Sequence, residues 1–191
     1  MKYPTLVLLA GALAFTLRGD ARPAGDTDFS FESATIIFSQ ALAGAARVEI
    51  YEGLPSDPKD FDREKKANSC RQITDQWFYS APQEMRHKHV QRLQRLVDSR
   101  IFLPQPDGKP GGGFHGDFAV VLTYPKNTVY AVFCFDRREV RIVREGNPFA
   151  ADPEMADFRV TADLDSKSFE DLRSVLTGYR DLERASASSG G

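Results

Sequence analysis

The chain has few cysteines, no excess of charge of either sign, and no apolar run long enough to cross a membrane as a helix. Of its 191 residues two are cysteines, and the formal net charge is −2 at pH 7. Nonspecific binding to nucleic acid needs a clear excess of lysine and arginine, so we expect no nucleic-acid partner. The apolar run from Leu6 to Leu17 covers about 12 residues, whereas a helix needs about 20 to span a bilayer core of ~30 Å. We therefore expect no stable transmembrane anchor in the mature protein, after removal of any N-terminal signal.

Several easily recognised catalytic motifs are also absent. The sequence has no serine-centred nucleophile elbow and no His-Glu-x-x-His motif, which removes the most readily identified hydrolases. Its glycine-rich segment, GGGFHGDF at 111–118, is not a phosphate loop, because Lys109 precedes the glycines and a strand-like run follows them. A dinucleotide-binding fingerprint fails for the same reason. The glycines instead indicate a loop that joins a sheet where backbones approach closely.

The N-terminus has the pattern of an export signal. Lys2 precedes the apolar run, and Gly19 and Ala21 have the spacing of the small residues before a signal-peptidase site. This pattern predicts a signal peptide over 1–21, a linker over 22–29 and an exported protein, either periplasmic or secreted. A buried N-terminal helix or an uncleaved anchor is the alternative.

The remaining residues, 30–182, predict a single α+β domain. Apolar residues recur at helical spacing at both ends of this segment. Near-continuous apolar runs at 117–124 and 129–136 predict two central antiparallel strands joined by a turn. We expect an antiparallel sheet of about four to five strands with helices on one face, including a C-terminal helix. We expect residues 183–191 to form a disordered tail.

The two cysteines, Cys70 and Cys134, leave two interpretations open. An exported protein folds where the compartment can be oxidising, so the pair could form a disulfide and give a redox or disulfide-linked protein. The alternative is two buried thiols that behave as small apolar side chains. Sequence alone does not show whether their Cα atoms are close enough to bond.

His115 and Asp117 form the first candidate site. They are two residues apart, so in an extended segment both side chains point to the same face. An imidazole and a carboxylate placed together could ligate a metal or act as a base with its orienting carboxylate. The alternative is a structural hydrogen bond that fixes the loop.

The segment CFDRRE, residues 134–139, is the second cluster. It joins two predicted strands, so Asp136 to Arg138 predicts a tight turn and Glu139 begins the next strand. If these strands are neighbours, Cys134 and Glu139 could converge with the histidine and aspartate of the glycine-rich segment. A surface turn rich in aspartate and arginine is the simpler interpretation.

Four short segments, RVEIYEGLP, WFYSAP, GGGFHGDF and VFCFDRREVRI, resemble a family of uncharacterised exported bacterial proteins. In that family EGLP is often followed by His, and later segments resemble Cys-Gly-Gly-Phe-His-x-Asp and Cys-Phe-x-Cys-x-Glu. The resemblance covers roughly residues 46 to 145 and implies no mechanism. The matching positions are Gly112, Gly113, Phe114, His115, Asp117, Cys134, Phe135 and Glu139.

The chain departs from that family pattern at three positions. Gly111 and Arg137 stand where the family has cysteines, and Ser56 stands where it has the histidine after EGLP. If the relatives hold a metal through thiolates or close a disulfide there, this chain lacks most of those ligands. The resemblance therefore argues against a soft thiolate metal site.

These observations give three functional hypotheses. The first is an exported, non-catalytic binding or structural module of the cell envelope, because no complete catalytic set is present. The second is a metal- or acid/base-assisted hydrolase that uses His115, Asp117 and Glu139. The third is the redox or disulfide-linked protein through Cys70 and Cys134. The sequence identifies no cofactor.

Overall fold

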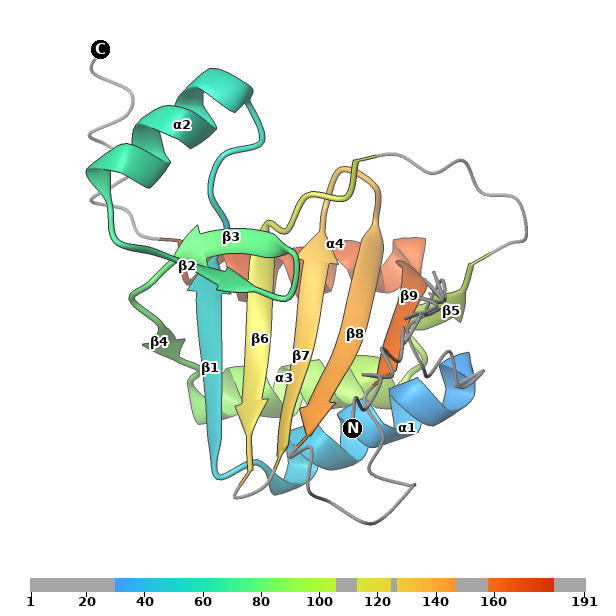
Figure 1. The fold of residues 1–191 in the computed structure, drawn as a ribbon. Helices are drawn as coiled ribbons and strands as arrows, with labels where there is room; N and C mark the ends of the chain where they lie inside the picture. Colours follow the sequence, from blue (N-terminus) through green and yellow to red (C-terminus); the bar gives the residue numbers. More distant parts are fainter. Residues whose placement is uncertain (1–29, 106–112, 125–126, 147–157, 181–191) are drawn as a thin grey trace, which may run out of the picture.

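The protein is described from a computed structural model that covers residues 30–105, 113–124, 127–146 and 158–180 (Figure 1). The predicted signal peptide at 1–21, linker at 22–29 and tail at 183–191 lie outside these residues. In the part of the chain that is described, no helix combines the length and the apolar character needed to span a bilayer.

The centre of the fold is an antiparallel sheet of seven strands in the order β4-β1-β6-β7-β8-β9-β5. The predicted α+β class and antiparallel sheet are confirmed, but the prediction of four to five strands is wrong. The two edge strands are too short to show an alternating apolar pattern, so sequence patterns do not predict them. The strands are β1 (Arg47–Glu52), β4 (Gln83–Glu84), β5 (Phe102–Pro104), β6 (Phe118–Thr123), β7 (Asn127–Cys134), β8 (Glu139–Gly146) and β9 (Phe158–Leu164).

Three helices cover one face of this sheet: α1 (Phe31–Gly44), α3 (His87–Asp98) and α4 (Ser166–Thr177) (Figure 1). The predicted C-terminal helix is confirmed. Side-chain caps fix two of the starts, since Ser30 accepts from the Ser33 N–H and Asp165 accepts from the Ser168 N–H. The apolar stripes of the three helices and the facing side chains of six strands make the main core.

The opposite face carries a smaller core beneath a hairpin of β2 (Cys70–Ile73) and β3 (Gln76–Tyr79). Thr74, at φ 56°, makes the turn between these two strands. Phe78 is fully buried there and packs in a cluster with Phe114 and with the outward-facing side chains of β1, β6 and β7. The hairpin therefore covers the half of the sheet that contains β1 and β6 (Figure 1).

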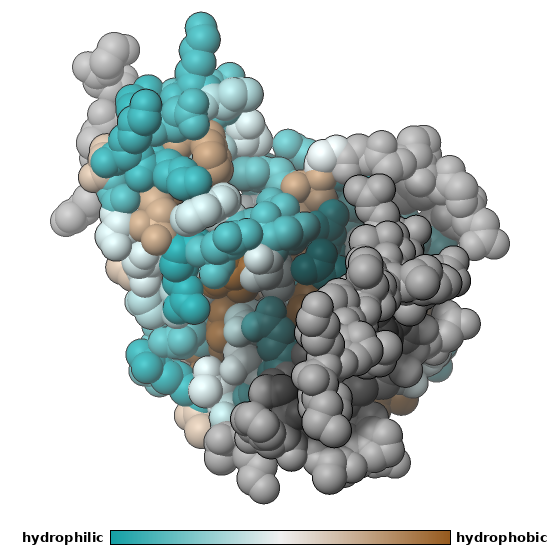
Figure 2. Space-filling view, in the orientation of Figure 1, coloured by the Kyte–Doolittle hydropathy of each residue, from teal (hydrophilic) through white to brown (hydrophobic). Residues whose placement is uncertain are grey.

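Helix α2 (Pro58–Ala67) lies apart from both cores (Figure 1). Asp57 caps its first turn and Pro58 opens it, but none of its residues is buried. Figure 2 shows a predominantly hydrophilic surface over this helix. Two contacts attach it to β3: the Lys65 ammonium lies 3.5 Å from the centre of the Trp77 ring, and the Tyr79 hydroxyl donates to Glu64 Oε2 at 3.1 Å.

Candidate functional site

Two segments that are more than 55 residues apart in sequence meet at one end of the sheet. Gly53, in the segment EGLP, donates its backbone N–H to the carbonyl oxygen of Asp117 at 2.8 Å. The approach is so close that a Cβ on Gly53 would lie 1.8 Å from the carbonyl oxygen of Gly116. Only glycine fits at position 53 in this contact.

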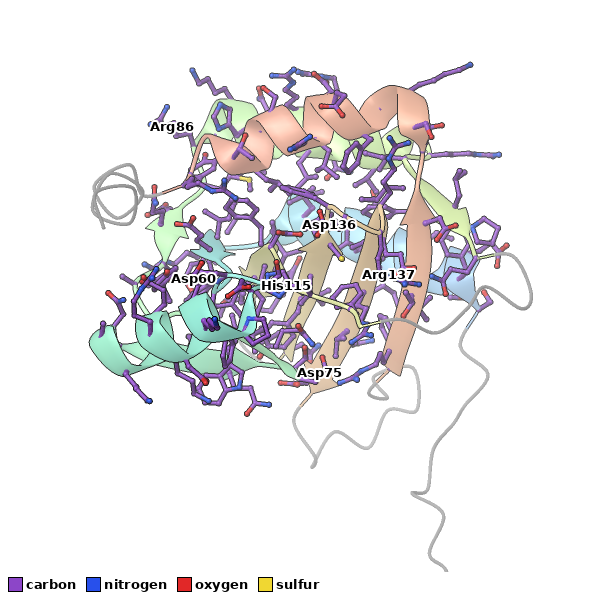
Figure 3. The ribbon with its side chains drawn as sticks, turned by 90° about the horizontal axis from the view of Figure 1, so that it is seen from above. Asp60, Asp75, Arg86, His115, Asp136 and Arg137 are labelled. Carbon is purple, nitrogen blue, oxygen red and sulfur yellow. The ribbon has the colours of Figure 1, made fainter. Side chains whose placement is uncertain are left out.

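A cavity of about 530 Å³ opens where these segments meet. Its floor comes from the end of β1 and from the loop before β6, and one wall comes from α2. In Figure 3 His115 lies between α2, which carries Asp60, and the strands of the sheet. The polar side chains around the cavity are Glu52, Ser56, Asp57, Asp60, Arg63, Glu64, Tyr79, His115, Asp117 and Arg180.

His115 and Asp117 line this cavity together, as the spacing of two residues predicts. The segment that carries them is not a strand, because β6 begins only at Phe118. Asp117 is half-buried, and its Oδ2 accepts the backbone N–H of Phe135 at 2.7 Å. Burial raises the pKa of Asp117, opposed by this hydrogen bond and by the nearby charges of His115 and Arg180.

The imidazole of His115 lies in the lining of the cavity. Among the residues that the structure describes, no side chain or backbone group is hydrogen-bonded to it, and its charge acts on the carboxyl of Asp117. The predicted structural hydrogen bond therefore belongs to the aspartate, which ties the loop to the turn after β7.

Glu139 does not line the cavity. It is buried on β8, directly opposite Cys134 of β7, and both of its carboxylate oxygens lie 3.0 Å from Nε of Arg137. Figure 3 shows Arg137 farther across the sheet than His115. The tight turn predicted at 136–138 is present, with Arg138 at φ 51°. The pair of Glu139 and Arg137 thus clamps this turn.

Cys134, the first residue of the second predicted cluster, is 1% exposed. Burial raises the pKa of its thiol, and the backbone N–H groups of His115 and Arg137 donate to its sulfur. The Cys70 sulfur lies 3.5 Å from the carbonyl oxygen of Asn68. Both cysteines are thiols in the structure, and the predicted disulfide stays a prediction that thiol counting tests.

The sequence did not point to Arg180, Asp60 or Tyr79 as members of a site. Arg180 follows the last helix and pairs through Nε with Glu52 at 3.2 Å, across more than 120 residues of sequence. Asp60 belongs to a helix that reads as an ordinary solvated one. The sequence feature that could have indicated this site is the occurrence of EGLP together with the glycine-rich segment in the family-like pattern.

No group of three histidine, cysteine, aspartate or glutamate side chains within 30–105, 113–124, 127–146 and 158–180 is arranged to hold a metal ion. The side chains that line the cavity offer one imidazole, several carboxylates, two guanidinium groups and the hydroxyls of Ser56 and Tyr79. No protein-family model, curated protein or solved structure matches this chain.

Proposed function

We propose that the protein is an exported α+β domain that binds a small polar molecule in the cavity between α2 and the loop before β6, without catalysing its conversion. The observation that carries the proposal is the convergence of EGLP and the segment with His115 and Asp117 on one cavity of about 530 Å³. That volume suits a metabolite or a sugar. The sequence pattern of the N-terminus supports export.

Two features favour binding over catalysis. Glu139 does not join His115 and Asp117, so the three-residue set expected of a hydrolase is not assembled in the cavity. The Asp117 carboxylate is already engaged by the Phe135 N–H. A site of fixed polar groups with one available imidazole suits recognition of a ligand by hydrogen bonds.

A ligand screen tests the proposal. Thermal unfolding and NMR chemical shifts are followed while sugars, amino acids, amines and organic acids are added at millimolar concentration. A true ligand at 100 times its Kd stabilises the fold by ~2.7 kcal/mol. Ser56→Trp places a bulky side chain in the lining of the cavity and should abolish that stabilisation. Ser174→Trp, at an exposed position of α4 outside the cavity, should preserve it.

The screen contradicts the proposal if every compound leaves the unfolding temperature of the protein unchanged. It does so equally if Ser56→Trp responds to each active compound as the unsubstituted chain does, because binding would then lie elsewhere.

An acid/base hydrolase is the second candidate function. It is favoured by one observation, the shared placement of an unengaged imidazole and a carboxylate in an open cavity. Assays with ester, amide, glycoside and phosphoester substrates decide it. Turnover that His115→Ala removes, with the circular dichroism spectrum unchanged, would establish the hydrolase and overturn the non-catalytic proposal.

The redox or disulfide-linked alternative is decided by counting thiols in the denatured, unreduced protein. Two thiols exclude a bond between Cys70 and Cys134, and none would establish it. We expect two, with Cys134 reacting only after unfolding because it is 1% exposed.

A further inference from the structure

The charges around the cavity are unequal. Five carboxylates line it, those of Glu52, Asp57, Asp60, Glu64 and Asp117, against the two guanidinium groups of Arg63 and Arg180. With His115 neutral, five negative and two positive charges leave a formal charge of −3. A half-open cavity with walls of low dielectric concentrates such a field on whatever enters it.

Both guanidinium groups are already occupied by carboxylates of the wall. Arg63 lies 2.8 Å from Asp60 and 3.4 Å from Glu64. Arg180 pairs with Glu52 at 3.2 Å. An anionic ligand would have to break these pairs and then face the carboxylates that they release.

The remaining two carboxylates accept hydrogen bonds from backbone N–H groups. Asp57 accepts the N–H groups of Lys59 and Asp60 at the start of α2. Asp117 accepts a single N–H through Oδ2, so its Oδ1 keeps its capacity to accept. It is also half-buried, and its charge lies beside the available imidazole of His115.

A cation placed between His115 and Asp117 satisfies both groups at once. It can donate a charge-assisted hydrogen bond to Oδ1 of Asp117 and a second one to an unprotonated ring nitrogen of His115. Neither gain is available to a carboxylate or phosphate ligand. Tyr79 belongs to the same lining, and its hydroxyl donates to Glu64, which keeps that carboxylate in the wall of the cavity.

We infer that the ligand of the cavity carries a positively charged group, a protonated amine or a guanidinium, which is held by Asp117 and His115 and faces the acidic side of α2. The inference rests on the proposed binding function and deepens it by giving the chemical class of the ligand.

The test uses two sets of probes that share a scaffold and differ in charge. Glucosamine, glucose and glucuronate form the first set, and butylamine, butanol and butyrate form the second. Their dissociation constants are measured on the full-length protein by titration calorimetry and by NMR shifts of the residues that line the cavity. We expect the amine of each set to bind roughly tenfold or more tightly than its neutral and anionic analogues.

Variants locate the charge that selects the amine. Asp117→Asn keeps the shape and the acceptor oxygen for Phe135 and weakens amine binding about tenfold. Asp60→Asn lies on a helix without buried residues and so does not disturb the core. It should weaken amine binding by roughly threefold. Glu170→Gln removes one negative charge at an exposed position of α4, outside the cavity, and should leave the affinity for the amine unchanged.

The outcomes separate this inference from the function on which it rests. If glucose or glucuronate binds in the cavity as tightly as glucosamine, the charge preference is wrong and the binding function stands. The same holds if only neutral or acidic compounds of the wider screen bind there. If nothing binds in a manner that Ser56→Trp blocks, both are overturned.

Discussion

At the scale of single residues, the contact between Gly53 and Gly116 brings the two segments of the site together. Gly53 has no room for a side chain because the carbonyl oxygen of Gly116 occupies the Cβ position. Gly116 is confined in turn, since its own Cβ would lie 2.9 Å from both Phe78 and Val132. The backbone at Gly53, the backbone at Gly116 and the side chains of Phe78 and Val132 are therefore closely packed at this point.

The first prediction concerns Gly53→Ala. The added methyl group must push the two backbones apart and break the bond from the Gly53 N–H to Asp117, so we expect a loss of roughly 3 kcal/mol in the free energy of unfolding. Gly113→Ala is the matched control, because nothing lies within 4 Å of its Cβ. It should change stability little or raise it by up to ~1 kcal/mol. Urea unfolding measures both, and equal effects would contradict the close contact.

The second prediction concerns the pH dependence of stability through Asp117. Burial raises the pKa of this carboxyl in the folded state above the unfolded value of ~3.9. Between these two values the folded state binds more protons, so the contribution of Asp117 to stability falls as the pH rises through that window. Below the unfolded value the group is protonated in both states and its contribution no longer changes.

Asp117→Asn removes this titration. The difference in unfolding free energy between the variant and the unsubstituted protein should therefore change from about pH 4 upward, in favour of the variant, and then level off. Urea unfolding at several pH values between about 4 and 7.5 checks it. Parallel profiles for the two proteins would show that Asp117 titrates at its ordinary pKa.

The candidate residues show how far sequence reasoning reaches at this scale. The spacing predicted that His115 and Asp117 lie together, and both side chains line the cavity although their segment is not a strand. Whether Glu139 joined them depended on how far its strand lies from the loop, and that is set by tertiary structure. Arg180 reaches Glu52 only after the last helix has packed, so no local pattern announces it.

At the scale of elements, α2 differs from the other three helices. It contributes nothing to either core and is attached to β3 by a cation–π contact and a hydroxyl bond. Few of its residues are apolar, so its sequence predicts no face that packs in a core. The structure adds that this solvated helix forms a wall of the cavity.

The third prediction follows from this weak attachment. Amide hydrogens of α2 should exchange faster than those of α1, α3 and α4, because few buried contacts oppose local opening. Tyr79→Phe removes the bond to Glu64 and should speed exchange in α2 by roughly three- to tenfold, with the other helices unchanged. Tyr130→Phe, on β7, makes the same chemical change elsewhere and should leave α2 as it was. Equal protection of all four helices would contradict the prediction.

At the scale of the whole molecule, the α+β class followed from helical patterns at the two ends and strand-like runs between them. The central strands were recognisable because they are buried on both faces. The hairpin β2–β3 and the edge strands β4 and β5 were not, since runs of two to four residues show no period and obtain their conformation from their neighbours.

The fourth prediction concerns the residues before α1. The buried side chains of the described core come from Ala34 to Tyr179. A chain without residues 1–29 should therefore keep its unfolding free energy to within about 1 kcal/mol, as a removable signal peptide and linker require. Comparison of the two chains by urea unfolding measures this. A loss of several kcal/mol would show that this segment packs against the domain and would contradict the signal-peptide prediction.

The order of the strands has a consequence for the path by which the chain folds. From β6 to β9 each strand pairs with the next one in sequence. In contrast, β1 pairs with β6, which lies far from it in sequence, as the pairing of Glu52 with Phe118 shows. Because loop closure slows distant pairings, we expect the four successive strands to form the transition state and β1 to add afterwards. Gly53→Ala should then accelerate unfolding and leave the refolding rate nearly unchanged, which stopped-flow kinetics will measure. The contact that builds the cavity would thus govern the lifetime of the folded protein rather than the speed of its formation.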